Sequence, residues 1–467
     1  MWLVTRVVIV GGGPGGYEAA LVASQLGGEV TLIDRDGLGG AAVLTDCVPS
    51  KTLIATAEVM TSMQSASELG LTIGGGTVQH AINVNLGLVN RRVLELARAQ
   101  SADIAHNLAA SGVQVISGSG RLDGPNAVVA TVEGGEQRFD AEVILLCTGT
   151  RPRELSDAQP DGERILTWKQ VYSLEQVPEH LVVVGSGVTG AEFASAYNAL
   201  GAKVTLVSSR EMVLPGQDEE AARVLQDVFK RRGVDVRPRS RAVGARRDGD
   251  GVIVTLASGE TIAASHCLMA VGAVPNTENL GLETANIVTN RGYITVDKVS
   301  RTNARGVYAA GDVTGVFALA SVAAMQGRIA MWHALGEGVA PLRLKTVCST
   351  VFTHPEIATV GYSEVEAETG PALAQTLMIP LATNARAKML GLEEGFIKIV
   401  ARRLTGIVIG GVVVAPEASE LILPIAVAVQ NRLTVKDLAY TFSVYPSLSG
   451  SITELSRRLM SVSADAL

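Results

Sequence analysis

The sequence predicts an α/β protein in which one nucleotide-binding unit of parallel strands and helices occurs twice. The stretch VVIVGGGPGGYEAA near the N-terminus and the stretch LVVVGSGVTGAEFA in the middle both contain the pattern GxGxxG. Each pattern follows a short apolar run, precedes a helical pattern and leads to a second strand-like run, EVTLID or KVTLVSS. One GxGxxG alone is weak evidence, whereas two copies in this strand–turn–helix context predict two dinucleotide sites.

The composition agrees with a globular protein of several domains. The chain has 467 residues, of which 47% are hydrophobic and 18% are charged, and this length suggests about three domains. Its net charge of −7 argues against a nucleic-acid partner and against an anionic membrane surface. We find no secretory signal and no apolar run suited to crossing a membrane. We therefore expect a cytoplasmic protein without integral membrane contact.

The cysteines and histidines predict neither a disulfide framework nor a metal site. Cys47, Cys147, Cys267 and Cys348 are far apart in the sequence and contain no CxxC pair, so we expect free thiols. The last three lie in apolar, strand-like runs and are interpreted as core residues. The six histidines are scattered without the spacing of metal ligands, and no metal is expected.

The glycine loops have a definite physical role. The first glycine makes a tight turn, the second lets the backbone approach a pyrophosphate, and the third permits close packing of the helix on the strand. The phosphates then lie at a helix N-terminus, where free amides and the helix dipole favour anions. The residues predicted to contact the two dinucleotides are Gly11, Gly13, Pro14, Gly15 and Gly16 in the first loop, and Gly185, Gly187, Val188, Thr189 and Gly190 in the second.

The two copies differ where the second strand ends, and this difference predicts different adenosine riboses. In the first copy Asp34, followed by Arg35, can accept hydrogen bonds from ribose hydroxyls and would repel a 2′-phosphate. The same step in the second copy reaches Ser208, followed by Ser209 and Arg210, an end that suits a 2′-phosphate. The first site therefore suits FAD, and the second tolerates or prefers NADPH over NADH.

Five further motifs follow one another in a recognisable order. They are GGAAVLTDCVPSK, ILLCTGTRPR, CLMAVGAVPNT, GVYAAGDV and VFTHPEIATVG. Together with the two glycine loops, they resemble the pyridine nucleotide–disulfide oxidoreductases, which include lipoamide dehydrogenase, glutathione reductase and mercuric reductase. The resemblance covers nearly the whole chain, and it is specific because many separate motifs fall in register.

The resemblance implies three domains and an assembly. The FAD-binding domain would comprise residues 1–152 and 276–341, with an NAD(P)-binding domain inserted at 153–275. Residues 342–467 would form an α/β dimerisation domain. A two-fold homodimer is expected, in which the C-terminal tail of one subunit reaches the flavin of the other, and a dimer of such dimers is left open.

The resemblance also assigns residues to the flavin and the nicotinamide. Lys51 matches the family's lysine beside flavin N5, and Glu192 matches the glutamate that pairs with it. Asp312 matches the aspartate that holds the ribityl chain. Further FAD-binding positions implied in this way are Gly40, Gly120, Thr148, Gly149, Gly311 and Ala320, and Gly272 is implied for NAD(P).

The chain departs from the family at the redox dithiol. The family segment reads G-G-T-C-L-N-V-G-C-I-P-S-K, so its first cysteine falls on Ala42 and its second on Cys47. The family's terminal H-P-T-x-x-E is FSVYPSLSGSITE here, with Tyr445 in place of the histidine and Gly450 in place of the glutamate. Tyrosine has an ordinary pKa of about 10 and is a poor proton shuttle at neutral pH. The attacking thiol, its base and the partner of that base are thus absent together.

These observations predict an FAD-dependent NAD(P)H:quinone reductase, or diaphorase. A hydride would pass from NAD(P)H to the flavin and on to a quinone or a similar small acceptor, without a redox disulfide. The candidate catalytic residues are Lys51, Glu192 and Tyr445, whereas Cys47 is more simply interpreted as a small residue packed by the flavin. Within the family, the chain resembles the cysteine-deficient, lipoamide-dehydrogenase-like quinone reductases.

Three alternatives remain open at this stage. The first is a soluble nicotinamide transhydrogenase, although the family's transhydrogenases keep the terminal histidine. The second is a peroxidase or oxidase that cycles Cys47 through a sulfenic acid. The third is a flavin-binding redox sensor or partner subunit without useful turnover. A true lipoamide dehydrogenase is not expected, because the dithiol is missing.

Overall fold

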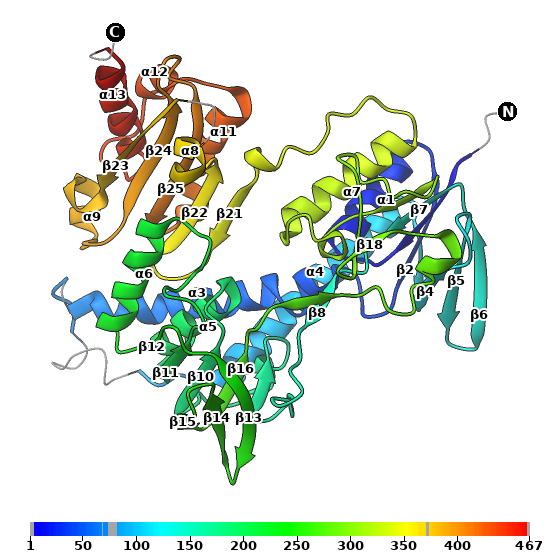
Figure 1. The fold of residues 1–467 in the computed structure, drawn as a ribbon, viewed down its shortest axis with the longest axis horizontal. Coiled ribbons are helices and arrows are strands. Elements are labelled where there is room, and N and C mark those ends of the chain that lie inside the picture. The colour runs from blue at the N-terminus through cyan, green and yellow to red at the C-terminus, as the bar shows by residue number, and fades with distance from the viewer. Residues whose placement is uncertain (1–3, 68, 73–81, 370–372, 465–467) are drawn as a thin grey trace.

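Three five-stranded sheets organise the chain (Figure 1). The computed structural model describes residues 4–67, 69–72, 82–369 and 373–464. Two of the sheets are parallel and are flanked by helices, and the third is antiparallel. Among the described residues, no helix combines the length and apolar character needed to span a bilayer. The predicted α/β class is confirmed.

The first parallel sheet has the strand order β20-β7-β1-β2-β3. The chain runs outward from β1 to β2 and β3 and then returns to pair β7 with the other side of β1. The order therefore reverses between β1 and β7, which is where open α/β sheets bind ligands. The elements of this unit are β1 (Arg6–Val10), α1 (Pro14–Gln25), β2 (Glu29–Asp34), α2 (Gly40–Leu44), α3 (Cys47–Gln64), η1 (Ser65–Ser67), α4 (Leu86–Ala110), β3 (Gln114–Ser117), β7 (Val143–Leu146), β20 (Val307–Ala309) and α7 (Ala320–Ala334), with the antiparallel strands β4 (Ser119–Leu122), β5 (Ala127–Val132) and β6 (Gly135–Asp140) beside the sheet.

The second parallel sheet repeats this plan with the order β12-β11-β10-β16-β9. Its reversal lies between β10 and β16, so the second glycine loop occupies the same topological position as the first. The predicted duplication is thus present in the fold. The elements are β9 (Ile165–Thr167), η3 (Val171–Ser173), β10 (His180–Val184), α5 (Val188–Ala199), β11 (Lys203–Val207), α6 (Glu219–Arg231), β12 (Asp235–Arg237) and β16 (His266–Met269), with the antiparallel strands β13 (Ala242–Asp248), β14 (Gly251–Leu256) and β15 (Thr261–Ala264).

A short antiparallel pair marks the place where the chain leaves the first unit and returns to it. Strand β8 (Thr150–Pro152) pairs with β17 (Ala273–Pro275). Beside this pair, Thr148 Oγ1 donates to Asn276 O at 2.7 Å, and Asn276 Nδ2 donates to Thr148 O at 2.8 Å. The returning segment contains η4 (Leu282–Ala285), β18 (Thr289–Asn290), β19 (Tyr293–Ile294) and η5 (Asp312–Thr314).

The third sheet is antiparallel and has the order β21-β22-β25-β24-β23. Helices α11 and α13 cover one face, and the other face adds Val351, Phe396 and Val414 to a core shared with the second unit. The central strand β25 is buried along its whole length. The elements are η6 (Leu344–Thr346), β21 (Cys348–Val351), β22 (Glu356–Gly361), α8 (Glu364–Thr369), β23 (Ala374–Pro380), η7 (Leu381–Thr383), α9 (Ala385–Met389), β24 (Phe396–Arg402), β25 (Val408–Ala415), α10 (Ala418–Leu421), α11 (Leu423–Asn431), α12 (Val435–Ala439) and α13 (Gly450–Ala464).

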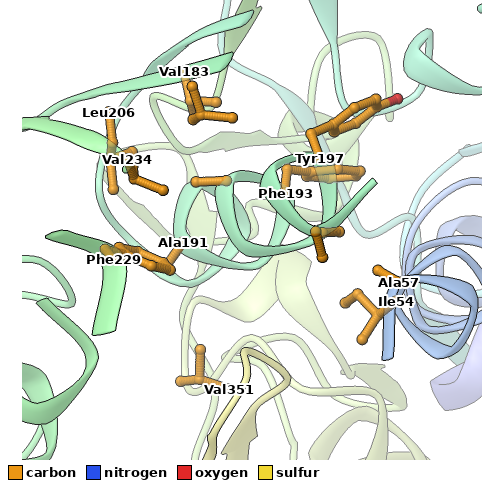
Figure 2. Close-up of a cluster of buried hydrophobic side chains, with 14 of the residues drawn as sticks. Ile54, Ala57, Val183, Ala191, Phe193, Tyr197, Leu206, Phe229, Val234 and Val351 are labelled. Carbon is orange, nitrogen blue, oxygen red and sulfur yellow. The ribbon is translucent and has the colours of Figure 1, made fainter. Parts of the chain in front are cut away.

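Helix α5 lies at the centre of the shared core (Figure 2). Its Phe193 and Tyr197 are buried, with Val183 of β10 above the helix in this view. Ile54 of α3 and Val351 of β21 belong to the same cluster. Each fully buried side chain of this size contributes on the order of 1.5–3 kcal/mol. The core therefore fixes α3, α5 and β21 relative to one another, and the site described below is built on these elements.

Candidate functional site

The two glycine loops have matching backbone geometry. Gly11 and Gly185 have φ angles of +105° and +109°, where L side chains are strained. A Cβ at Gly16 would lie 1.9 Å from Gly11 O, and a Cβ at Gly190 would lie 1.8 Å from Gly185 O. The helix can therefore pack on the turn only if glycine occupies these positions, as the sequence predicted.

Both loops present open helix N-termini, which is the arrangement that a pyrophosphate requires. Helix α1 begins after Gly13 and α5 begins after Gly187, and no side chain of the described residues caps either end. A Cβ added at Gly187 meets no atom within 4 Å, and one at Gly13 meets only Gly40 Cα at 4.0 Å. The first-turn amides thus face free space beside a positive helix end. The residues present fit two dinucleotides.

Asp34 at the end of β2 is held by the backbone around it. Its Oδ2 accepts from Gly12 N at 2.6 Å, and its Oδ1 accepts from the amides of Asp36 at 2.9 Å and Gly37 at 2.6 Å. Burial raises the pKa of Asp34, and these amide hydrogen bonds oppose the rise. Oδ1 thus uses both of its lone pairs, and Oδ2 keeps one for a ribose hydroxyl. The neighbouring Arg35 is exposed and pairs with Asp36 at 2.9 Å.

At the end of β11 the three predicted residues have different surroundings. Ser208 is fully buried, and its Oγ lies 2.7 Å from Ser186 Oγ and accepts from Arg210 N at 3.2 Å. Ser209 and Arg210 are exposed. Within the described part of the chain, the Arg210 guanidinium has no ion pair. Arg210 thus offers an unpaired guanidinium, as far as the described residues show, while the Ser208 hydroxyl is used inside the fold.

An ion pair joins the two nucleotide-binding units. Lys51 Nζ on α3 lies 2.9 Å from Glu192 Oε2 on α5, and the side chains are 31% and 4% exposed. Glu192 Oε1 accepts from Phe352 N at 2.9 Å, and Lys51 Nζ lies 4.9 Å from the centroid of the Phe352 ring. Burial lowers the pKa of Lys51, but the charge and hydrogen bond of Glu192 outweigh it, so this pKa is raised. Lys51 is therefore a fixed positive charge.

The remaining predicted cofactor positions lie in loops after strands, at the starts of helices or within a strand. Thr150 Oγ1 is 3.4 Å from Asp312 Oδ2, and burial raises the pKa of Asp312 while this hydrogen bond opposes the rise. Gly149, Gly272 and Gly311 have φ angles of +64°, +93° and +80°. The other predicted positions are Gly40 at the start of α2, Gly120 in β4, Thr148 after β7 and Ala320 at the start of α7.

Cys47 has no partner thiol. It begins α3 as a free cysteine, and the first family cysteine position is Ala42 in α2. Burial raises the pKa of Cys47 to about 12, Asp46 adds to the rise and Lys51 opposes it. A pKa in this range keeps the thiol protonated at neutral pH. Within the described ranges, no three His, Cys, Asp or Glu side chains are grouped to hold a metal ion.

The interpretation of three cysteines as core residues is correct for two of them. Cys147 and Cys267 are buried, but Cys348 is only partly buried. Cys348 lies on β21, which is an edge strand of the antiparallel sheet, and an edge strand has no neighbour on one side.

The structure of the single chain does not bring Tyr445 to the other candidate residues. Tyr445 is 86% exposed, in the loop between α12 and α13, and Gly450 begins α13. It lines a pocket of about 370 Å³ made by its own domain. No hydrogen bond among the described residues links this loop to Lys51 or Glu192. The loop also exposes Phe442 and Val444, which are large apolar side chains.

Two residues near the ion pair were missed by the sequence reasoning. Asp46 precedes Cys47 where the family pattern has glycine, so comparison of the two segments carried the signal. Tyr172 in η3 is buried, and its hydroxyl has no hydrogen-bond partner within the described ranges. Its ring centroid lies 6.4 Å from that of Phe193, the residue after Glu192 on α5, and burial, followed by the charges of Asp46, Glu192 and Cys47, raises its pKa. No motif pointed to Tyr172.

Family models match almost the whole chain. The model described as pyridine nucleotide-disulphide oxidoreductase matches residues 5–327, and the model of the dimerisation domain of this family matches residues 347–456. Among individual proteins, the chain is 56% identical to "NAD(P)H dehydrogenase (quinone)" of Mycobacterium tuberculosis strain H37Rv, over 98% of this chain and 94% of that protein. It is 34% identical to dihydrolipoyl dehydrogenase of Zymomonas mobilis, over 96% of each chain.

Solved structures agree with these matches. The crystal structure of LpdA from Mycobacterium tuberculosis superposes with a TM-score of 0.93 at 56% identity, covering 98% of this chain and 100% of that chain. The HOCl-induced flavoprotein disulfide reductase RclA from Escherichia coli superposes with a TM-score of 0.85 at 25% identity, covering 97% and 99%. The chain therefore belongs to the pyridine nucleotide–disulphide oxidoreductase family, as its motifs predicted, and the family's cofactors, FAD and a pyridine nucleotide, are its own.

Proposed function

We propose that this protein is an FAD-dependent NAD(P)H:quinone reductase that works without a redox disulfide. One observation carries the proposal: the Lys51–Glu192 pair is intact, whereas Cys47 is a single thiol whose pKa is raised to about 12. The site can therefore receive electrons from a nicotinamide but has no dithiol to pass them to a disulfide substrate. The relative named "NAD(P)H dehydrogenase (quinone)", at 56% identity, supports this function.

The residues of this chain would bind the cofactors and fix the charges around them. FAD, when bound, supplies a two-electron carrier between the nicotinamide and the acceptor. The loop at residues 11–16 would hold its pyrophosphate, with Asp34 on the ribose and Asp312 on the ribityl chain. Lys51 would place a positive charge beside the reacting ring, and Glu192 and the Phe352 amide would hold that charge in position.

The second glycine loop would bind NADPH as well as NADH. Arg210 is an exposed guanidinium without an ion pair among the described residues, and it follows the end of β11, where an adenosine ribose would bind. A guanidinium recognises a phosphate through two parallel hydrogen bonds. Ser209 is exposed beside it, and Ser208 contributes by leaving this strand end without the carboxylate that the first site has in Asp34.

We propose the domain division 1–152 with 276–341, 153–275 and 342–467, and a two-fold homodimer in the cytoplasm. The pairing of β8 with β17 supports the points where the second domain is inserted. The match of residues 347–456 to a dimerisation domain supports the assembly. The exposed loop with Tyr445 would then reach the partner's site, where Tyr445 would border the acceptor pocket. A dimer of dimers has no support here.

The test uses anaerobic protein with bound FAD. NADPH, and NADH in a separate run, are mixed with the protein while the oxidised-flavin absorption is followed. A benzoquinone, a naphthoquinone or lipoamide is then added. The proposal expects fast bleaching and fast recovery with the quinones but not with lipoamide. Recovery with lipoamide, or with a second nicotinamide nucleotide alone, would overturn it.

A further inference from the structure

Asp46 occupies the N-cap of α3 but does not cap the helix. Its backbone is fixed, because Asp46 N donates to Ala41 O at 2.8 Å and Ser50 N donates to Asp46 O at 2.8 Å. An aspartate at this position ordinarily accepts a hydrogen bond from a first-turn amide. The Asp46 carboxyl makes no such bond, and its φ and ψ of −129° and −91° lie outside the usual N-cap region. The carboxyl is therefore available to interact with a bound molecule.

The free carboxyl lies in the site rather than at the surface. It is partly buried, and it interacts electrostatically with Lys51, Glu192 and Asp312, and with Lys169 from the segment before η3. Burial raises the pKa of Asp46, Lys51 and Lys169 oppose the rise, and the two other carboxylates add to it. The hydroxyl of buried Tyr172 also has no hydrogen-bond partner among the described residues. In the part of the chain that the structure describes, a carboxyl and a hydroxyl without hydrogen-bond partners thus lie near the charge pair.

Quinone reduction needs a proton that the site must deliver. NAD(P)H, one proton and a quinone give NAD(P)⁺ and a hydroquinone. The nicotinamide gives up a hydride, which is two electrons and one hydrogen nucleus, and the quinone gains both electrons. The second hydrogen of the hydroquinone comes from a proton. In the family pattern a histidine provides acid–base chemistry, but Tyr445 takes its place here. Cys47 remains a thiol of very weak acidity.

We propose, as an extension of the quinone reductase function, that Asp46 is a catalytic residue that protonates the quinone oxygen during reduction. In this step the O–H bond of the Asp46 carboxyl breaks and an O–H bond forms on the quinone oxygen. The Asp46 carboxylate then regains a proton from water. General acids of this kind contribute roughly 10²–10⁴-fold to the rate.

Three variants at this position separate the acid from the side chain's bulk. Asp46→Asn keeps the shape and removes the proton, and Asp46→Gly restores the residue of the family pattern, so its folding is expected. Asp46→Glu restores the acid. Glu58→Gln is the matched control, because Glu58 is a half-buried carboxyl on the same helix, and burial and Glu356 raise its pKa. Each holoenzyme is assayed with a benzoquinone and with ferricyanide, which accepts electrons without a proton.

The expected pattern is specific to proton delivery. Asp46→Asn and Asp46→Gly should lose about 100-fold in kcat with the quinone and keep the ferricyanide rate and the rate of flavin bleaching by NADPH. Asp46→Glu should recover most of the loss, and Glu58→Gln should change nothing. The wild-type quinone rate should fall as pH rises through the Asp46 pKa, because the acid must be protonated, and this limb should vanish in Asp46→Asn.

A readout independent of turnover is the infrared band of protonated carboxyls in the resting holoenzyme. The infrared difference spectrum between wild type and Asp46→Asn should show one such band. The pH at which this band is half lost should equal the pH at which the quinone rate is half lost. The absence of this band, or a quinone rate within twofold of wild type in both Asp46→Asn and Asp46→Gly, would overturn the assignment. If the wild type itself reduces ferricyanide but no quinone, the proposed function fails instead.

Discussion

The Lys51 ammonium lies 2.9 Å from Glu192 Oε2, and this pair joins α3 of the first nucleotide-binding unit to α5 of the second. The Phe352 amide, which follows β21 of the antiparallel sheet, donates to the other oxygen of Glu192 at 2.9 Å. One carboxylate thus connects all three sheets at the place where electrons are expected to arrive. Disturbing it should affect electron transfer and stability together.

The Glu192→Gln variant should slow the reduction of the flavin by NADPH at least about 10-fold, because the charge that positions Lys51 is lost. The amide can still accept from Phe352 N. The free energy of unfolding should fall by about 2 kcal/mol. This is less than the ~3–5 kcal/mol typical of a broken buried pair, because the Lys51 side chain is 31% exposed and water can solvate its charge. Stopped-flow bleaching and urea unfolding measure the two effects. Glu58→Gln is the control, and equal bleaching rates in both variants would refute a role for the pair.

Arg210 should determine the preference between the two nicotinamide nucleotides. The Arg210→Gln variant should lower kcat/KM for NADPH about 10-fold, through the loss of about 1.4 kcal/mol of phosphate binding, and should leave NADH unchanged. Steady-state kinetics with both donors measure this. Arg223→Gln removes an exposed guanidinium of the same domain that is paired with Glu219 at 2.7 Å, and it should change neither value. An equal loss with NADH would show that Arg210 does not read the 2′-phosphate.

Cys47 should be dispensable for turnover. Burial raises its pKa to about 12, so the thiolate that any sulfur chemistry requires is scarce at pH 7. The Cys47→Ser variant should keep quinone reduction within about twofold of wild type, and its unfolding free energy should change little because the volumes are similar. The measurement is the anaerobic quinone assay together with a peroxide assay. A large loss with peroxide would support the peroxidase alternative instead.

The sequence predicted the parts of the molecule whose residue types are forced by backbone geometry. At Gly16 and Gly190 a Cβ would lie within 2 Å of a carbonyl oxygen. Only glycine can occupy these positions in this fold, so the glycine pattern in the sequence indicates the turn. The Lys51–Glu192 pair was also predicted, because both residues match the paired lysine and glutamate of the family motifs. Tyr172 was not, because the burial of its hydroxyl, which has no partner among the residues that the structure describes, depends on tertiary packing that no spacing encodes. Tyr445 was predicted at the site, but in one chain it lies on an exposed loop, and a contact between two copies cannot be derived from the spacing of residues in one sequence.

A buried lysine should hold the antiparallel sheet to the second nucleotide-binding unit. Lys398 on β24 is 2% exposed and lies 2.8 Å from Asp218 Oδ2, 2.5 Å from Glu220 Oε2 and 3.1 Å from Glu364 Oε2. The Lys398→Met variant should lose about 3 kcal/mol of unfolding free energy at pH 7, because Asp218 is left buried without its cation. Lys345→Met, which removes a lysine paired with Glu366 but 43% exposed, should cost less than about 1 kcal/mol.

The pH dependence of the Lys398 effect has a defined sign. The hydrogen bond from Lys398 lowers the pKa of Glu220 below its ordinary 4.5, so this stabilisation is present above that value and is lost as pH falls through the folded pKa. Burial lowers the pKa of Lys398, but the three carboxylates outweigh it and raise the pKa above 10.5, so this part is lost only in strong alkali. The difference in Tm between wild type and Lys398→Met should therefore shrink as pH falls below the ordinary glutamate pKa of 4.5 and through the folded pKa of Glu220. A difference that stays constant through acid unfolding would contradict the assignment.

Val427 on α11 should lie in the interface between two copies of the chain. It is 45% exposed, Leu423 one turn earlier is exposed on the same face, and the helix lies within the matched dimerisation domain. The Val427→Glu variant places a charge on this apolar face and should halve the mass measured by light scattering, while FAD stays bound. Loss of the dimer should also lower quinone turnover, because the Tyr445 loop of one copy would no longer reach the site of the other.

Val243→Glu is the matched control for this variant, since Val243 on β13 is also 45% exposed but lies in the second unit. A Val427→Glu protein that keeps its mass would place the interface on another surface.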